Sequence, residues 1–137
     1  MDIANHPTVF ARHACLRSRI GGDVHVLTYT EASTTAVDAL VTHLQAIHTE
    51  TQYDTPRRIL VDSSSVGTQP VNYKMDRLRN VLPGVNTPHA TRIAVLHTNS
   101  VMMRIVRVLL STLTHNNLHI RVFYQHERTA AIAWLQA

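Results

Sequence analysis

The sequence predicts an α/β fold built on one mixed, mostly parallel five-stranded sheet. Two observations carry this prediction. The first two strand-like segments are joined by a tight-turn sequence, and every later strand-like segment is followed by a segment with helical spacing. A tight turn joins antiparallel strands, whereas parallel strands need a crossover, usually a helix. The predicted order is therefore ββαβαβαβα, with an N-terminal β-hairpin.

The hairpin rests on residues 13–30. Residues 13–20 alternate between two sides: Ala14, Leu16 and Ile20 share one of them. Such alternation is typical of a half-buried strand. Gly21-Gly22-Asp23 is a strong turn sequence, and residues 24–30 then form the returning strand.

Three further strands are predicted at 59–61, 92–97 and 118–124. The first two are apolar on consecutive residues, as expected for strands covered on both faces. Residues 118–124 alternate instead, which is typical of a strand at the edge of a sheet.

Four segments are predicted as helices. The first opens at 33–35 and ends in 49–52, the second runs from Pro70 to Pro83-Gly84, the third follows 98–100 and closes at 115–117, and a short Ala-rich helix spans 127–136. An apolar stripe at helical spacing marks the first three. In the third helix, the stripe predicted to face the sheet is Met102, Ile105, Val106, Leu109 and Leu113.

Length and composition indicate one globular domain. The chain has 137 residues, of which 45% are hydrophobic and 16% charged. Residues 13–137 are predicted as the domain, and residues 1–12 as an N-terminal arm or short strand. No apolar run is long enough to span a membrane and the start does not resemble a signal peptide, so we expect a cytoplasmic protein. The single cysteine, Cys15, excludes an internal disulfide and a cysteine-based zinc site.

The charge is +4, and twelve of the thirteen basic residues are arginine. These arginines are scattered and are not interleaved with aromatics, so the pattern does not favour nucleic acid. Lys74, Arg77, Arg104 and Arg107 are a candidate basic surface for an acidic partner or a phosphate group. The alternative is two solvated helix faces.

The loop after the strand at 59–61 is the richest in polar side chains. Ligands and partners of such sheets meet the carboxyl ends of the strands. Asp62, Ser63, Ser64, Ser65 and Thr68 are therefore a candidate partner-binding, phosphorylation or anion-binding loop. The alternative is that Asp62 and Ser64 cap backbone groups of the turn.

Catalytic and metal motifs are absent from the sequence. There is no Gly-x-Ser-x-Gly elbow, and four glycines do not form a phosphate-binding loop. Ten histidines are present, but the pairs His43/His48 and His115/His119 do not provide three converging ligands. We predict no catalytic residue, no metal, no cofactor and no enzymatic activity.

Several strings resemble the SpoIIAA-like fold, which is shared by STAS domains (anti-sigma factor antagonists) and lipid-binding relatives of the CRAL-TRIO type. They lie at 58–66, 92–96, 122–124 and 127–135, and the resemblance covers the chain from about Cys15 onward. Asp62 matches the first aspartate of the family. The antagonists carry a second Asp-Ser-x-Gly whose serine is phosphorylated. It should fall near 67–70, where it is absent and Thr68 is the only hydroxyl, so the match is to a divergent branch of the family.

The resemblance implies a non-enzymatic interaction or regulatory domain, with a protein partner or self-association through a helix face or an edge strand. The alternative is a binder of a small lipid-like or anionic ligand, as in the lipid-binding relatives. An interaction module should expose an apolar patch. A ligand binder should enclose a pocket, lined by residues such as Met75, Met102 and Met103.

Overall fold

The fold was examined in a computed structural model that describes residues 13–21, 23–50, 56–66, 69–81, 91–98, 100–112 and 117–137. The strands are β1 (Cys15–Ile20), β2 (Val24–Tyr29), β3 (Arg57–Asp62), β4 (Thr91–His97) and β5 (Leu118–Tyr124). The helices are α2 (Thr34–Glu50), α3 (Val71–Val81), α4 (Ser100–Ser111), the short 3-10 helix η3 (Gln125–Glu127) and α5 (Arg128–Gln136). The predicted α/β class and ββαβαβαβα order are confirmed. The predicted arm at 1–12 lies outside the described residues.

Within the described residues, the sheet has the strand order β1-β2-β3-β4-β5. Strands β1 and β2 are antiparallel, with Cys15 opposite Tyr29 and Ile20 opposite Val24. Gly21 takes the left-handed conformation (φ 61°) that this tight turn requires. All later neighbours are parallel.

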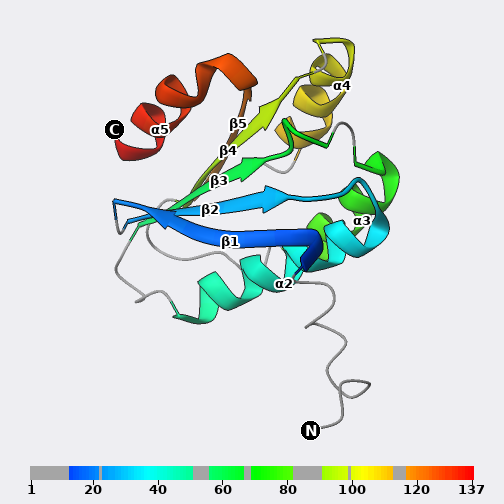
Figure 1. Cartoon of the computed structure of the whole chain (residues 1–137), viewed down its shortest axis with the longest axis horizontal. Helices are drawn as coiled ribbons and strands as arrows, with labels where there is room; N and C mark the ends of the chain where they lie inside the picture. The colour runs from blue at the N-terminus through cyan, green and yellow to red at the C-terminus, as the bar shows by residue number, and fades with distance from the viewer. Residues whose placement is uncertain are drawn as a thin grey trace, which may run out of the picture.

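Among the described residues, the topology places three α-helices on one face of the sheet and one on the other. Each crossover joins neighbouring strands in the same direction, so right-handed connections bring α2, α3 and α4 to the same face. Helix α5 packs on the opposite face, and Figure 1 shows it on the other side of the strands from α2. The inner strands therefore bury both faces. Ile59 and Val61 join the larger core under α2–α4, while Leu60 joins the smaller core under α5.

Two arginines hold the end of α5 against the sheet. Arg58 Nε donates to the carbonyl of Leu135 (2.9 Å), and Arg92 Nη1 donates to the carbonyl of Trp134 (2.6 Å). The guanidinium of Arg92 also lies 5.5 Å from the centroid of the Trp134 ring. Both arginines supply positive charge and hydrogen-bond donors at the C-terminal carbonyls of the helix.

The start of the hairpin differs from the prediction. His13 and Ala14 are helical, and strand β1 begins only at Cys15. The carbonyl of Ala14 accepts from the backbone N–H of Thr30 (2.9 Å), so this residue still joins the two arms of the hairpin. None of the described helices combines the length and hydropathy needed to cross a bilayer.

Candidate functional site

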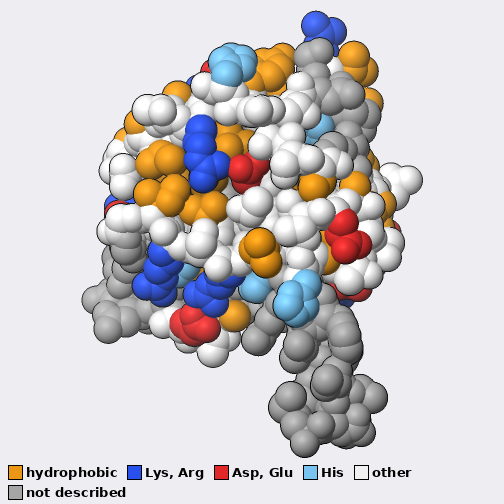
Figure 2. Space-filling model, viewed as in Figure 1, with side chains coloured by type: hydrophobic (Ala, Val, Ile, Leu, Met, Phe, Trp, Pro, Cys, Tyr) orange, Lys and Arg blue, Asp and Glu red, His pale blue; other side chains and the backbone are white. Residues whose placement is uncertain are grey.

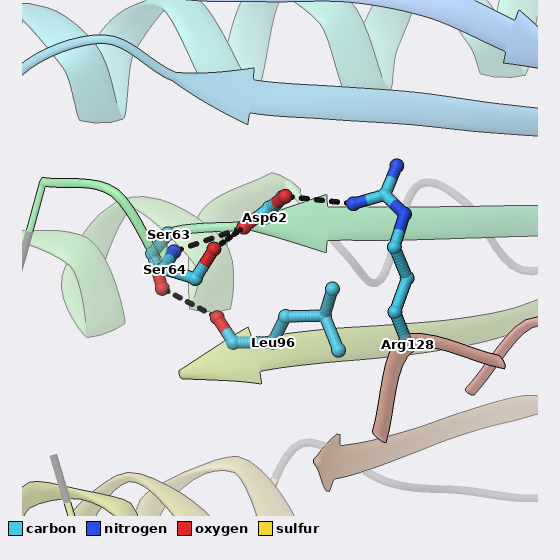
Figure 3. Close-up of polar contacts among 5 residues, drawn as sticks. All are labelled: Asp62, Ser63, Ser64, Leu96 and Arg128. Carbon is cyan, nitrogen blue, oxygen red and sulfur yellow. Dashed lines mark hydrogen bonds and ion pairs between the residues drawn. The ribbon is translucent and has the colours of Figure 1, made fainter. Parts of the chain in front are cut away.

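The predicted polar loop lies at the carboxyl end of β3, where the chain turns toward α3. Asp62 ends the strand, and its Oδ1 accepts from both the backbone N–H and the hydroxyl of Ser64. The hydroxyl of Ser63 donates to the carbonyl of Leu96 on β4 at 2.8 Å. Figure 3 shows these contacts side by side. They are the contacts expected if Asp62 and Ser64 cap the turn.

The second carboxylate oxygen of Asp62 forms an ion pair with the start of helix α5. Its Oδ2 lies 2.8 Å from Nη1 of Arg128, the first residue of α5 (Figure 3). The Asp62 side chain is 12% exposed and that of Arg128 is 44% exposed. Because both oxygens of Asp62 are engaged, the carboxylate serves the turn and the α5 junction. Ser65 is exposed, and Thr68 lies outside the described residues.

The structure places the four residues of the predicted basic surface in three different settings. Arg77 faces α2, where its Nε lies 3.1 Å from Oδ1 of Asp38. Arg104 and Arg107 are exposed on α4. On the face drawn in Figure 2, Lys and Arg side chains lie in several separate places rather than in one basic field.

Lys74 does not join the arginines at the surface. Its Nζ lies 5.2 Å from the centroid of the Tyr29 ring on β2. Burial lowers the pKa of Lys74 from 10.5 to about 8, and Cys15 acts in the opposite direction. Burial also raises the pKa of Cys15 to about 12 and that of Tyr29 well above its ordinary value. Among the described residues, no carboxylate lies within ion-pair distance of Lys74.

Two small cavities adjoin the Lys74 side chain, each with room of about 20 Å³. Lys74, Val95 and Leu110 line both of them. The first also contacts the polar side chains of Ser63, Gln69 and His97. The remaining residues of the second are all aliphatic: Leu40, Leu44, Val61, Leu78, Ile93 and Ile120.

The outer face of α4 carries an apolar stripe that the sequence analysis missed. Val101, Ile105 and Val108 are 68%, 46% and 66% exposed. Ile105 was predicted to face the sheet, and that prediction is wrong: Met103 and Leu110 are the buried residues instead. The helix is apolar on most of its circumference, so spacing alone could not identify its inner side.

A groove runs between α4 and the edge strand β5, with a volume of about 540 Å³. Arg107 of α4 and Arg121 of β5 contribute positive charge to it. The guanidinium of Arg121 lies 5.0 Å from the centroid of the Phe123 ring. One carboxylate, Glu127, lines the groove and accepts from the backbone N–H of Tyr124 at 2.8 Å.

Within the described part of the chain, no three histidine, cysteine, aspartate or glutamate side chains converge as metal ligands. No protein-family model, no curated protein and no solved structure matches the chain. The similarity to STAS domains is therefore carried by the short strings of the sequence and remains a prediction.

Proposed function

We propose that this chain is a non-enzymatic, STAS-like interaction domain of the cytoplasm, which docks an acidic protein partner through the outer face of α4. The exposed apolar stripe of Val101, Ile105 and Val108 is the observation that carries the proposal. These residues stand at positions i, i+4 and i+7, so they form one row along the helix.

Single exposed hydrophobic residues are ordinary on protein surfaces, whereas a continuous row is not. Of the four large hydrophobic side chains that are exposed among the described residues, three lie in this row, and the fourth is Leu16 on β1. Fully burying a valine or isoleucine stabilises a complex by about 1.5–3 kcal/mol. A partner that covers the row would thus gain a substantial apolar contact.

The charges around the stripe favour an acidic partner over a second copy of the chain. Arg104 and Arg107 are exposed on the same helix, which has no acidic residue, and Arg121 lies on the adjacent edge of the sheet. A twofold dimer through α4 would bring these like charges together. An apolar ridge flanked by carboxylates would instead complement them.

The small size of the two cavities that adjoin Lys74 supports this proposal over a lipid-like ligand held beneath α3 and α4. The two cavities under α3 and α4 each have room for about one water molecule. A lipid-sized ligand would have to displace a helix before it could enter.

Capture from a lysate of the source organism, compared across three proteins, tests the proposal. The wild type is compared with Ile105→Glu on α4 and with Thr129→Glu, which introduces the same charge at an exposed position of α5 on the opposite face. We expect acidic proteins to be captured by the wild type and by Thr129→Glu, and to be lost with Ile105→Glu. Sedimentation velocity should show a monomer for all three.

Two results would contradict the proposal. One is that Ile105→Glu captures the same proteins as the wild type. The other is a wild-type dimer that Ile105→Glu dissociates, which would assign the stripe to self-association.

A further inference from the structure

We propose that the free edge of β5 receives an extended acidic segment of the protein partner, which joins the sheet as an added strand. Two neighbouring carboxylates of this segment pair with Arg107 and Arg121. The inference rests on the proposed function for the acidic character of the partner. It adds a second contact, made through the backbone of β5, beside the outer face of α4.

Strand β5 ends the described sheet, and one of its sides has no neighbouring strand there. The carbonyl of Asn117, just before β5, accepts from the backbone N–H of Thr91 on β4 at 2.7 Å. Because the backbone groups of alternate residues point to opposite sides of a strand, those of Ile120 and Val122 point away from β4. A row of such groups at a sheet edge is a template for pairing with another chain.

The groove between α4 and β5 follows this edge. Four consecutive residues of the strand line it: Ile120, Arg121, Val122 and Phe123. Successive side chains of a strand point to opposite faces of the sheet, so a groove lined by all four runs along the side of the strand. Its volume of about 540 Å³ is open along the backbone groups that the added strand would use.

The two arginines of the groove flank the edge from opposite faces. Arg121 is in register with Ala94, which belongs to the core under α5, and it stacks over Phe123 on that face. Arg107 lies on α4, which covers the other face. In the described part of the chain, neither arginine forms an ion pair.

This placement defines the acidic pattern that fits. An extended segment sends its successive side chains to opposite faces of the sheet. Two acidic residues that are neighbours in the segment therefore reach one arginine each. Two acidic residues separated by one position would both point to the same face and could pair with only one of the two arginines.

Glu127 sets the end of the open edge. Its Oε1 accepts from the backbone N–H of Tyr124 at 2.8 Å, which occupies the next outward-facing donor after Val122. The carboxylate also lines the groove. It repels acidic side chains from that end, so the neighbouring carboxylates of the partner are favoured beside the arginines.

Charge disfavours the other occupants and the other edge. A second copy paired through β5 would bring Arg121 close to its counterpart, and like charges across paired strands are destabilising. A groove also adjoins the opposite edge strand β1, but its arginine, Arg17, is already paired with Glu50 at 2.6 Å.

The test is an NMR titration of the ¹⁵N-labelled full chain at pH 7 and low salt. The probe is an end-blocked peptide, Thr-Val-Asp-Glu-Val-Thr, whose two carboxylates are neighbours. Its control, Thr-Asp-Val-Glu-Val-Thr, has the same composition with the carboxylates two positions apart. A third peptide carries N-methyl groups on the four central residues of the probe and so lacks their backbone donors.

We expect the probe to shift the amide signals of Ile120 and Val122. The control peptide should bind about two- to fivefold more weakly, because it loses one exposed ion pair. The N-methylated peptide should not shift these signals.

A matched pair of variants tests the contribution of the charge. Arg121→Gln should weaken binding of the probe by about two- to fivefold. Arg19→Gln removes an exposed arginine from the opposite edge strand and should leave the dissociation constant unchanged.

Three results would overturn the inference: no shift at Ile120 and Val122, equal affinity for the probe and its control, or equal affinity of Arg121→Gln and Arg19→Gln. Its failure is distinct from that of the proposed function. If these results were found while Ile105→Glu still lost the captured proteins, docking through α4 would stand alone. If the probe bound to β5 as expected while Ile105→Glu captured the same proteins as the wild type, the edge would be the docking site in place of α4.

Discussion

The side chain of Lys74 does not lie at the surface, although its position in the sequence suggests that it should. It stands one step outside the apolar row of Val71, Met75 and Leu78, so a solvated position was the natural expectation. In the structure, Met75 and Leu78 are buried and the lysine stem follows them inward. A lysine stem is long and apolar enough to pack in this way.

The partly buried ammonium of Lys74 should destabilise the fold at neutral pH. We expect Lys74→Met, which keeps the shape of the stem and removes the charge, to raise the free energy of unfolding by about 1–3 kcal/mol at pH 7. The difference should shrink as the pH rises. The folded wild type releases its proton near pH 8 while the unfolded chain keeps it to about 10.5, so wild-type stability increases with pH in that window.

Urea unfolding of both proteins between about pH 7 and pH 9 measures this effect. The pH should not be raised beyond about 9, because ionisation of Cys15 changes the stability in the opposite direction to that of Lys74. Its pKa is raised to about 12, so above its ordinary value of 9.0 the unfolded thiol ionises first and the folded state loses stability. A difference between wild type and variant that does not change with pH would contradict the prediction.

Asp62 stabilises the turn after β3 and the start of α5. Asp62→Ala removes the acceptor for Ser64 and the partner of Arg128, and it should cost about 1–2 kcal/mol in the free energy of unfolding. Asp62→Asn keeps an acceptor for Ser64 and loses the charge, so its free energy of unfolding should lie between those of the wild type and Asp62→Ala. Chemical denaturation measures the series. The exposed ion pair of Asp76 provides the control, since Asp76→Ala should cost less than about 0.5 kcal/mol.

Proteins captured by the wild type should also be captured by Asp62→Ala. If Asp62→Ala lost these proteins while its stability stayed unchanged, the loop would be a binding element rather than a structural turn.

At the scale of elements, α4 is the helix whose buried side was not predicted correctly from the spacing of its apolar residues. Its sequence offers more than one apolar row, and only contact with the sheet decides which row is buried. Met103 and Leu110 face the core, and Val106 and Leu109 pack partly against it. The side chains of Val101, Ile105 and Val108 stay exposed.

A pair of substitutions on α4 distinguishes the inner side from the outer side. Leu110→Ala should cost about 2–4 kcal/mol in the free energy of unfolding, because it opens a cavity beneath the helix. Val108→Ala should change the free energy by less than about 0.5 kcal/mol, because Val108 is 66% exposed. Thermal or urea unfolding gives both values. Similar losses for the two variants would mean that the outer row already has a partner within the chain.

At the scale of the whole molecule, the strand order explains why Asp62 and Arg128 meet. Three successive crossovers occupy one face, and only the last helix passes to the other. The carboxyl end of β3 therefore meets the start of α5, which is why Asp62 can reach Arg128, 66 residues later in the chain. Nothing in the local sequence around either residue indicates this pairing.

Local pattern was sufficient for the class of fold and the order of the elements, because burial on one side of a helix or strand imposes a period on the residues. The turn at Gly21, the doubly covered strands β3 and β4 and the crossover helices follow from such patterns. Contacts between residues that are far apart in the chain produce no periodic pattern in the sequence. The position of Lys74 over Tyr29, the buried side of α4 and the contact between Asp62 and Arg128 were therefore decided only when the elements packed together.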